Sequence, residues 1–275
     1  MSAVMAVSIL EDRAVLRVAG ASASTFLQGL VSQDMSAAAG GLAFGALLTP
    51  QGKISAEFIA ARQDDGYLLD CHSSVAEALL KKLTVYRLRA AVALERSGEL
   101  AVAASTEGSA PGFAPDPRLG ALGGRAILPR DAALRLANAD GGAYDARRIA
   151  LGVPELGKDF GPDEMFLLDV NADALNGVNY KKGCFVGQEV TSRMKRKGEV
   201  RRRTLLARFE GAPPARGAPV VSGESTLGEI MSGTSGLALA NIRLDRLEAA
   251  RATAAPIAAD GKAIELRAPA YLDNA

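Results

Sequence analysis

The chain has 275 residues, of which 48% are hydrophobic and 23% charged, a balance that excludes a wholly disordered or fibrous protein. Its formal net charge of +1 provides no global field to attract nucleic acid or a membrane surface. Two cysteines, Cys71 and Cys184, are too few for a secreted disulfide framework or a self-contained zinc site. The charged run Glu11-Asp12-Arg13 ends a mildly apolar N-terminal stretch, and no apolar run approaches the roughly 20 residues that span a bilayer. We therefore expect a cytoplasmic protein without a membrane partner.

The N-terminal third alternates short strand-like and helical runs. A short helix is predicted after Ser22 or Ser24, and a longer helix opens at Ser73 or Ser74. The apolar residues of the longer helix follow helical spacing at Val75, Ala78, Leu79 and Leu83. Strands are predicted over residues 14–18, 44–49, 54–61 and 66–71, the middle two joined by the turn Pro50-Gln51-Gly52-Lys53. Strands mixed with single helices predict an α+β fold class.

The rest of the chain divides into a weakly patterned middle and a strand-rich end. Residues 98–140 are rich in proline and glycine and predict loops and short strands that link subdomains. A helix over 146–151 ends at Gly152. Short strands separated by turns are then predicted over 204–209, 219–221, 227–231, 237–240 and 263–266. This pattern indicates a small β-barrel or sandwich, and we predict domains over 1–203 and 204–275.

One segment, residues 179–194, carries unusual chemistry. Gly183 and Gly187 bracket Cys184 and allow positive φ or a close backbone approach. A helix that begins near Gln188 would direct its N-terminal amides toward Cys184, and Lys181 and Lys182 add positive charge. Such surroundings lower the pKa of a thiol. The alternative is a buried, inert cysteine in a glycine-rich turn.

Basic residues concentrate around the same segment. Residues 181–203 hold nine cations against two acids, a net charge of +7, so the rest of the chain carries −6. Such a segment could attract an anionic ligand, an RNA or an acidic protein. It could equally be a solvated basic loop.

The stretch Lys182-Gly183-Cys184-Phe185-Val186-Gly187-Gln188-Glu189 resembles the Lys-Gly-Cys-Tyr-x-Gly-Gln-Glu signature of the YgfZ family, with phenylalanine in place of the commoner tyrosine. Members of that family are folate-dependent proteins that help assemble or repair iron–sulfur clusters. Further landmarks follow in the family's order: Phe26-Leu27-Gln28-Gly29 with Asp34, residues 47–53, Tyr86-Arg87-Leu88-Arg89, and Arg148 through Gly152-Val153-Pro154. Residues 227–233 and 236–240 resemble the C-terminal barrel that the family shares with the glycine-cleavage T-protein.

This resemblance implies an α+β fold with three subdomains around a central folate cavity and a small C-terminal β-barrel, residues 1–203 forming two intertwined subdomains. It implies tetrahydrofolate, or a one-carbon derivative of it, as the cofactor and client iron–sulfur proteins as partners, with no resident metal. Cys184 and Lys182 are the implied functional pair. The implied cofactor-binding residues are Arg148, Gly183, Gly187, Gln188, Glu189 and Arg193.

The T-protein is an aminomethyltransferase, but two differences separate this chain from it. The T-protein carries an Asp-Asp pair in the hairpin where this chain has Ala56-Glu57, and it does not depend on a Lys-Gly-Cys motif. An accessory factor is therefore favoured over a classical enzyme, with a folate-dependent one-carbon transferase as the alternative. A third reading is an RNA-associated protein that uses residues 181–203, although no stacking aromatics interleave with these cations.

Overall fold

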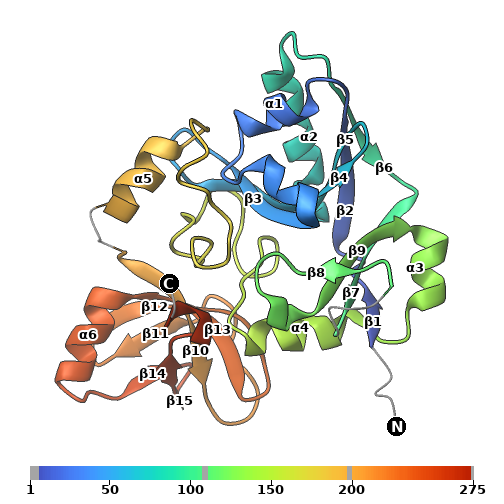
Figure 1. Ribbon diagram of the computed structural model, residues 1–275. Coiled ribbons are helices and arrows are strands. Elements are labelled where there is room, and N and C mark those ends of the chain that lie inside the picture. Colours follow the sequence, from blue (N-terminus) through green and yellow to red (C-terminus); the bar gives the residue numbers. More distant parts are fainter. Residues whose placement is uncertain (1–5, 107–110, 197–199, 274–275) are drawn as a thin grey trace.

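A computed structural model describes residues 6–106, 111–196 and 200–273. Three antiparallel sheets, each with its own helices, surround a set of central loops between residues 151 and 187 (Figure 1). Two of the sheets belong to the N-terminal part, and the third forms the C-terminal barrel. This arrangement confirms the predicted α+β class and its three subdomains.

The first sheet has the strand order β3-β4-β5-β2-β6. Its strands are β2 (Arg13–Ala19), β3 (Leu42–Leu48), β4 (Ile54–Gln63), β5 (Gly66–His72) and β6 (Ala93–Ser97), with α1 (Ala23–Gln28), η1 (Met35–Gly40) and α2 (Ser73–Arg87) packed on it. Helix α2 buries Ala76 where the spacing predicted Ala78, which is exposed. His72, and not a serine, caps this helix, because its Nδ1 accepts the N–H of Ser74 at 3.2 Å.

The second sheet has the strand order β1-β7-β9-β8, and all of its strands except β1 lie in the region where loops and short strands were predicted. Its elements are β1 (Val7–Ile9), β7 (Leu100–Ser105), β8 (Ala114–Pro115), β9 (Gly124–Pro129), η2 (Gly120–Leu122), α3 (Arg130–Leu136) and α4 (Gly141–Ala150). Five of the six residues of β7 are buried, so this strand lacks the alternation of buried and exposed positions that reveals a half-exposed strand.

The third sheet has the strand order β15-β14-β11-β12-β13-β10-β16 and encloses its own apolar core. Its elements are β10 (Arg202–Arg208), β11 (Pro219–Ser222), β12 (Ser225–Thr234), β13 (Leu237–Arg243), α6 (Leu244–Ala252), β14 (Ile257–Ala259), β15 (Lys262–Ala263), β16 (Glu265–Arg267) and η3 (Ala270–Leu272). The predicted barrel is confirmed, although α6 and β14 were not foreseen. Strand β10 begins at Arg202, and the division of the chain at residue 203/204 stays a prediction.

Buried charges join the two N-terminal sheets. Asp70 on β5 accepts hydrogen bonds from Arg13 on β2 and from Arg125 on β9, each at 2.6 Å. Arg118 extends this network by pairing with Asp116 at 2.7 Å and Glu155 at 2.6 Å. Because lone buried charges are strongly unfavourable, the pairing fixes how the two N-terminal sheets meet.

Candidate functional site

The loop that carries the cysteine motif is anchored to the segment between α1 and η1. The backbone N–H of Asn179 donates to the carbonyl of Ser32 at 3.0 Å, and the Ser32 hydroxyl donates to the carbonyl of Gly177 at 2.6 Å. Phe185 is buried in the main apolar core. The loop is thus fixed on both sides of Cys184.

Both glycines of the motif adopt the left-handed conformations that the sequence suggested, with φ of 101° at Gly183 and 79° at Gly187. Gly187 lies against the β3–β4 turn, where an added Cβ would come 2.6 Å from the carbonyl oxygen of Thr49. At Gly183 an added Cβ would meet nothing within 4 Å. Gly187 therefore permits a close approach that positions the start of α5 (Gln188–Arg196), whereas Gly183 provides only a turn.

The two cysteines have opposite environments. Cys184 is exposed, so the alternative of a buried, inert cysteine does not apply to it. Cys71 is fully buried in the core under the first sheet, and burial raises the pKa of its thiol to about 12. Only Cys184 can meet another molecule without unfolding of the protein.

We expect Ellman's reagent to titrate one thiol in the native protein and two in denaturant. At pH 8 a thiol with a pKa near 12 is almost wholly protonated, so Cys71 should react at least about a thousandfold more slowly than Cys184. The Cys184→Ala variant should show no fast thiol, and Cys71→Ala should show one. Two fast thiols in the native protein would contradict the burial of Cys71.

Lys182 anchors the loop. Its ammonium group donates to the carbonyl of Val31 at 2.5 Å and to that of Gln33 at 2.9 Å, and burial lowers its pKa to about 8. The N–H of Gln188 likewise bonds to the carbonyl of Phe185 at 3.2 Å. These groups hold the loop through backbone acceptors, and the predicted activation of the Cys184 thiol by Lys182 stays a prediction.

Helix α5 begins at Gln188 as predicted, and its residues divide between two surfaces. Arg193 lines a polar cavity of about 1070 Å³ between the β3–β4 turn and the barrel. Lys53, Asp169 and Arg202 line the same cavity. Gln188 and Glu189 line a separate groove on the helix. The residues predicted to bind a cofactor do not converge on one cavity.

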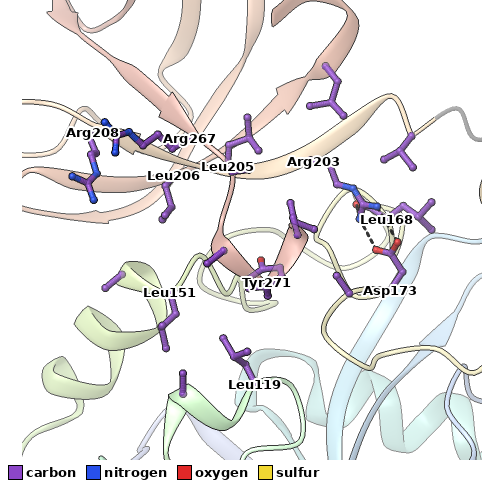
Figure 2. Close-up of a pocket in the computed structure, with 18 of the residues that line it drawn as sticks. Leu119, Leu151, Leu168, Asp173, Arg203, Leu205, Leu206, Arg208, Arg267 and Tyr271 are labelled. Carbon is purple, nitrogen blue, oxygen red and sulfur yellow. Dashed lines mark hydrogen bonds and ion pairs between the residues drawn. The ribbon is translucent and has the colours of Figure 1, made fainter. Parts of the chain in front are cut away.

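A larger cavity of about 1190 Å³ lies between the second sheet's part of the molecule, the central loops with α5, and the C-terminal barrel. Leu205, Leu206 and Tyr271 of the C-terminal part face Leu119 and Leu151 of the second part across it (Figure 2). These walls are apolar. Central cavities with apolar walls and a few polar groups are typical sites for small organic ligands.

The polar groups of this cavity are mostly cationic. Its lining includes four cations, Lys195, Arg203, Arg208 and Arg267, against one carboxylate, Asp173. Arg203 pairs with Asp173 in two hydrogen bonds of 2.5 and 2.9 Å, while Arg208 and Arg267 lie at the opposite end in Figure 2. An anionic group on a mainly apolar ligand would match this lining. Lys195 and Arg203 belong to the basic segment that the sequence associated with an anionic ligand, whereas Arg208 and Arg267 were missed.

Arg148 lies inside the protein. It is 1% exposed, and its guanidinium donates to Asp145 and Asp159, each at 2.6 Å, and to the Ser232 hydroxyl at 3.1 Å. Asp159 also accepts the backbone N–H of Ser232 at 3.0 Å. Arg148 therefore fastens α4 to barrel strand β12, an arrangement that gives no support to the predicted contact with folate.

Glu57 on β4 is also buried, at 3% exposed, and its Oε1 accepts the N–H of Leu156 at 2.8 Å. Burial, with Glu155 nearby, raises its pKa to about 7, despite the opposing effects of that hydrogen bond and of Arg118. This carboxyl group bonds to backbone within the protein. It gives no support to the alternative of a one-carbon transferase that uses the hairpin acid.

We expect Glu57→Gln to stabilise the protein above neutral pH. Because the folded-state pKa lies above the ordinary 4.5, ionisation of Glu57 costs stability as pH rises from about 4.5 to 7. The advantage of the variant in free energy of unfolding should reach about 3 kcal/mol at pH 8 and stay under about 1 kcal/mol at pH 5. Urea titrations at the two pH values measure it, and an equal difference at both would contradict the raised pKa.

The basic segment 181–203 is not one continuous surface. Arg203 pairs with Asp173, and Arg202 donates to the Asn241 side chain at 3.1 Å. Lys197 and Glu199 lie outside the described residues. Part of the predicted positive charge is thus used within the protein, which weakens the RNA-binding reading.

Comparisons with known proteins agree with this architecture. Residues 201–274 match the family model described as the CAF17 C-terminal beta-barrel domain. The fold resembles that of the glycine cleavage system aminomethyltransferase T from Bartonella henselae, with a TM-score of 0.75, 17% identity, and coverage of 98% of this chain and 86% of that one. The predicted T-protein-like fold is therefore confirmed.

Two sequence relatives carry the same name. The human mitochondrial iron–sulfur cluster assembly factor IBA57 is 31% identical over 280 residues, which cover 87% of this chain and 78% of that protein. The mouse IBA57 protein is 30% identical over 241 residues, covering 76% and 67%. These relatives fit the iron–sulfur part of the expected resemblance, but not its specific assignment to YgfZ.

The relatives also correct one prediction. Their names place them in mitochondria, so the prediction of a cytoplasmic protein is wrong. Within the described ranges, no helix combines the length and apolar character needed to cross a membrane. The extent and identity of the matches to the human and mouse proteins show that the chain belongs to the family of IBA57 iron–sulfur cluster assembly factors.

Proposed function

We propose that this chain is an accessory factor in the assembly or repair of iron–sulfur proteins and that Cys184 is its working thiol. The observation that carries the proposal is the exposure of Cys184 on a loop whose flanks are fixed by Phe185 and by the Ser32 contacts. A cysteine that is both accessible and held in place suits contact with a partner's cluster better than packing. The family of the chain supports the same role.

The number of accessible thiols limits how many ligands this chain can provide to an iron–sulfur cluster. Clusters are commonly held by four cysteine thiolates, and Cys71 is buried with a raised pKa. Cys184 is then the one cysteine ligand available from this chain. A cluster that contacts it is shared with a partner protein or completed by a small thiol, and the contact is transient. Lys182 acts as a positioning residue through its bonds to Val31 and Gln33.

Tetrahydrofolate, or a one-carbon derivative of it, fits the cavity between the second part and the barrel. The apolar walls around Leu151, Leu206 and Tyr271 suit an aromatic ring system. Arg208 suits a carboxylate of the glutamate tail, next to Arg267, which pairs with Glu265 at 2.6 Å. When bound, the folate would supply a one-carbon group. The protein's own residues orient the ligand and exclude water from its ring.

The test of the thiol is complementation of a strain that lacks the protein, with the activity of a 4Fe–4S enzyme as the readout. Wild type and Cys71→Ala should restore activity, whereas Cys184→Ala at matched levels should not, although its melting temperature stays within about 1 °C because the side chain is exposed. Full restoration by Cys184→Ala would refute the assigned role of the thiol.

The test of the folate site is calorimetry with tetrahydrofolate. Arg208→Glu should raise the Kd at least about tenfold, equivalent to about 1.4 kcal/mol, because it places a carboxylate opposite the ligand's own. Arg216→Glu is the matched control, since Arg216 is an exposed barrel arginine outside the cavity lining. Equal Kd values for the two variants would place the folate elsewhere.

A further inference from the structure

The end of α2 exposes apolar side chains that the protein itself does not use. Val85 is 66% exposed, Tyr86 37% and Leu88 88%. Among the described residues, the other large apolar side chains with comparable exposure are Leu134 and Leu136 on α3. Three of the five therefore lie within four consecutive residues.

The geometry of α2 explains this exposure. The helix packs on the first sheet as far as Leu83, and Lys82 makes a hydrogen bond of 2.8 Å to the hydroxyl of Ser55 near the start of β4. Beyond that point the helix continues past the sheet, and every residue from 84 to 89 is exposed. In Figure 1 this end of α2 forms the top of the view, on the side of the N-terminal part away from the barrel.

Leu88 also occupies a strained backbone position. Its φ of 45° and ψ of −106° are close to those of the second residue of a type II′ turn, and the N–H of Ala90 closes the turn on the carbonyl of Arg87 at 2.7 Å. Glycine is the usual residue there. Leucine at this position strains the backbone, and its exposed side chain has no packing within the protein to offset that strain. This combination is typical of positions that contact another molecule.

The charged residues in the sequence around this turn are all positive. Residues 78–94 include four cations, Lys81, Lys82, Arg87 and Arg89, and no acidic residue. Arg87 and Arg89 are exposed on either side of Leu88. A partner that buries Leu88 therefore gains most by presenting carboxylates around an apolar pocket.

We propose that the turn at residues 85–89 is a docking surface for a partner protein with an apolar pocket rimmed by acidic residues. Leu88 and Val85 fill the pocket, and Arg87 and Arg89 pair with the carboxylates of its rim. The inference goes beyond the proposed function, because it concerns a surface formed without any contribution from the cysteine loop.

The test places the photo-crosslinking residue benzoylphenylalanine at position 88 in living cells and repeats the labelling in a Cys184→Ala background. We expect one adduct with an acidic protein in both backgrounds, reduced at least about tenfold by Arg87→Glu with Arg89→Glu. The partner is then purified and titrated against wild type, and its Kd should rise at least about tenfold with the double variant and also with 0.5 M salt. Persistence of the adduct in Cys184→Ala separates this inference from the role of the thiol.

Leu88→Gly separates docking from folding. Glycine relieves the left-handed strain, so the melting temperature should stay equal or rise, while the Kd for the purified partner rises at least about tenfold. Leu134→Ala on α3 is the control and should leave the Kd unchanged. An adduct with a second copy of this chain, binding only to vesicles that contain 30% phosphatidylserine, or an adduct insensitive to charge reversal would each overturn the proposal.

Discussion

Replacement of Arg148 by alanine is expected to lower the free energy of unfolding by about 3 to 5 kcal/mol, because removal of one partner of a buried ion pair leaves the other charge uncompensated. Asp159, the main partner, is buried, and it also bonds to Ser232 of the barrel. The loss should therefore weaken the attachment of the barrel to α4. Urea denaturation followed by circular dichroism measures it.

Arg147→Ala is the matched control, since this neighbouring arginine makes a single exposed hydrogen bond to the carbonyl of Ala121. We expect it to change stability by less than about 1 kcal/mol. If Arg148 instead served mainly as a folate ligand, Arg148→Ala would lose tetrahydrofolate affinity while keeping wild-type stability. Such a result would restore the role that the family resemblance implied.

The spacing of apolar and turn-forming residues predicted those helices and strands whose position depends on neighbouring residues. The spacing of Val75, Leu79 and Leu83 follows the face that α2 buries, and the turn-separated strands after residue 203 form the barrel. The bounds of strand β7 were not predicted within its region of loops and short strands, because both of its faces are covered and a run of alanine and valine shows no period of two.

In the candidate site, too, features set by neighbouring residues were predicted and contacts between distant segments were not. The positive φ of Gly183 and Gly187 and the helix start at Gln188 follow from neighbouring residues, and sequence predicted them. The contacts of Lys182 and Arg148 do not. The acceptors of Lys182 lie about 150 residues away, and Ser232 lies 84 residues from Arg148, so no local pattern connects either residue to its partner.

The central cavity shows the same limit. Leu119, Leu151, Leu206 and Tyr271 come from four separate segments, and each looks like an ordinary core or surface residue in its own segment. Only the assembly of the second part with the C-terminal barrel places them around one space. Family resemblance predicted a central cavity, but none of the residues it transferred, which are Arg148, Arg193 and those of the cysteine motif, lines this one.

Gly187→Ala is expected to destabilise the protein by about 4 kcal/mol. The left-handed backbone costs a non-glycine residue about 1–3 kcal/mol, and the added Cβ would lie 2.6 Å from the Thr49 carbonyl oxygen, which adds an overpacking cost of about 1–3 kcal/mol. The Thr49 carbonyl belongs to the backbone of a hairpin turn, so it cannot move aside as a flexible side chain could. The loop would shift instead, and the rate at which Cys184 reacts with Ellman's reagent should change.

The Gly183→Ala variant separates the cost of the left-handed backbone from the cost of the steric clash. It has the same left-handed strain, but its Cβ meets open space, so its loss of stability should stay near the lower figure of about 1–3 kcal/mol. Thermal and urea denaturation of the two variants, with thiol titration of each, compares them directly. Equal losses would mean that the contact between Gly187 and the hairpin carries no energy. A larger loss for Gly187→Ala, with an altered thiol rate, would show that the hairpin positions the cysteine loop.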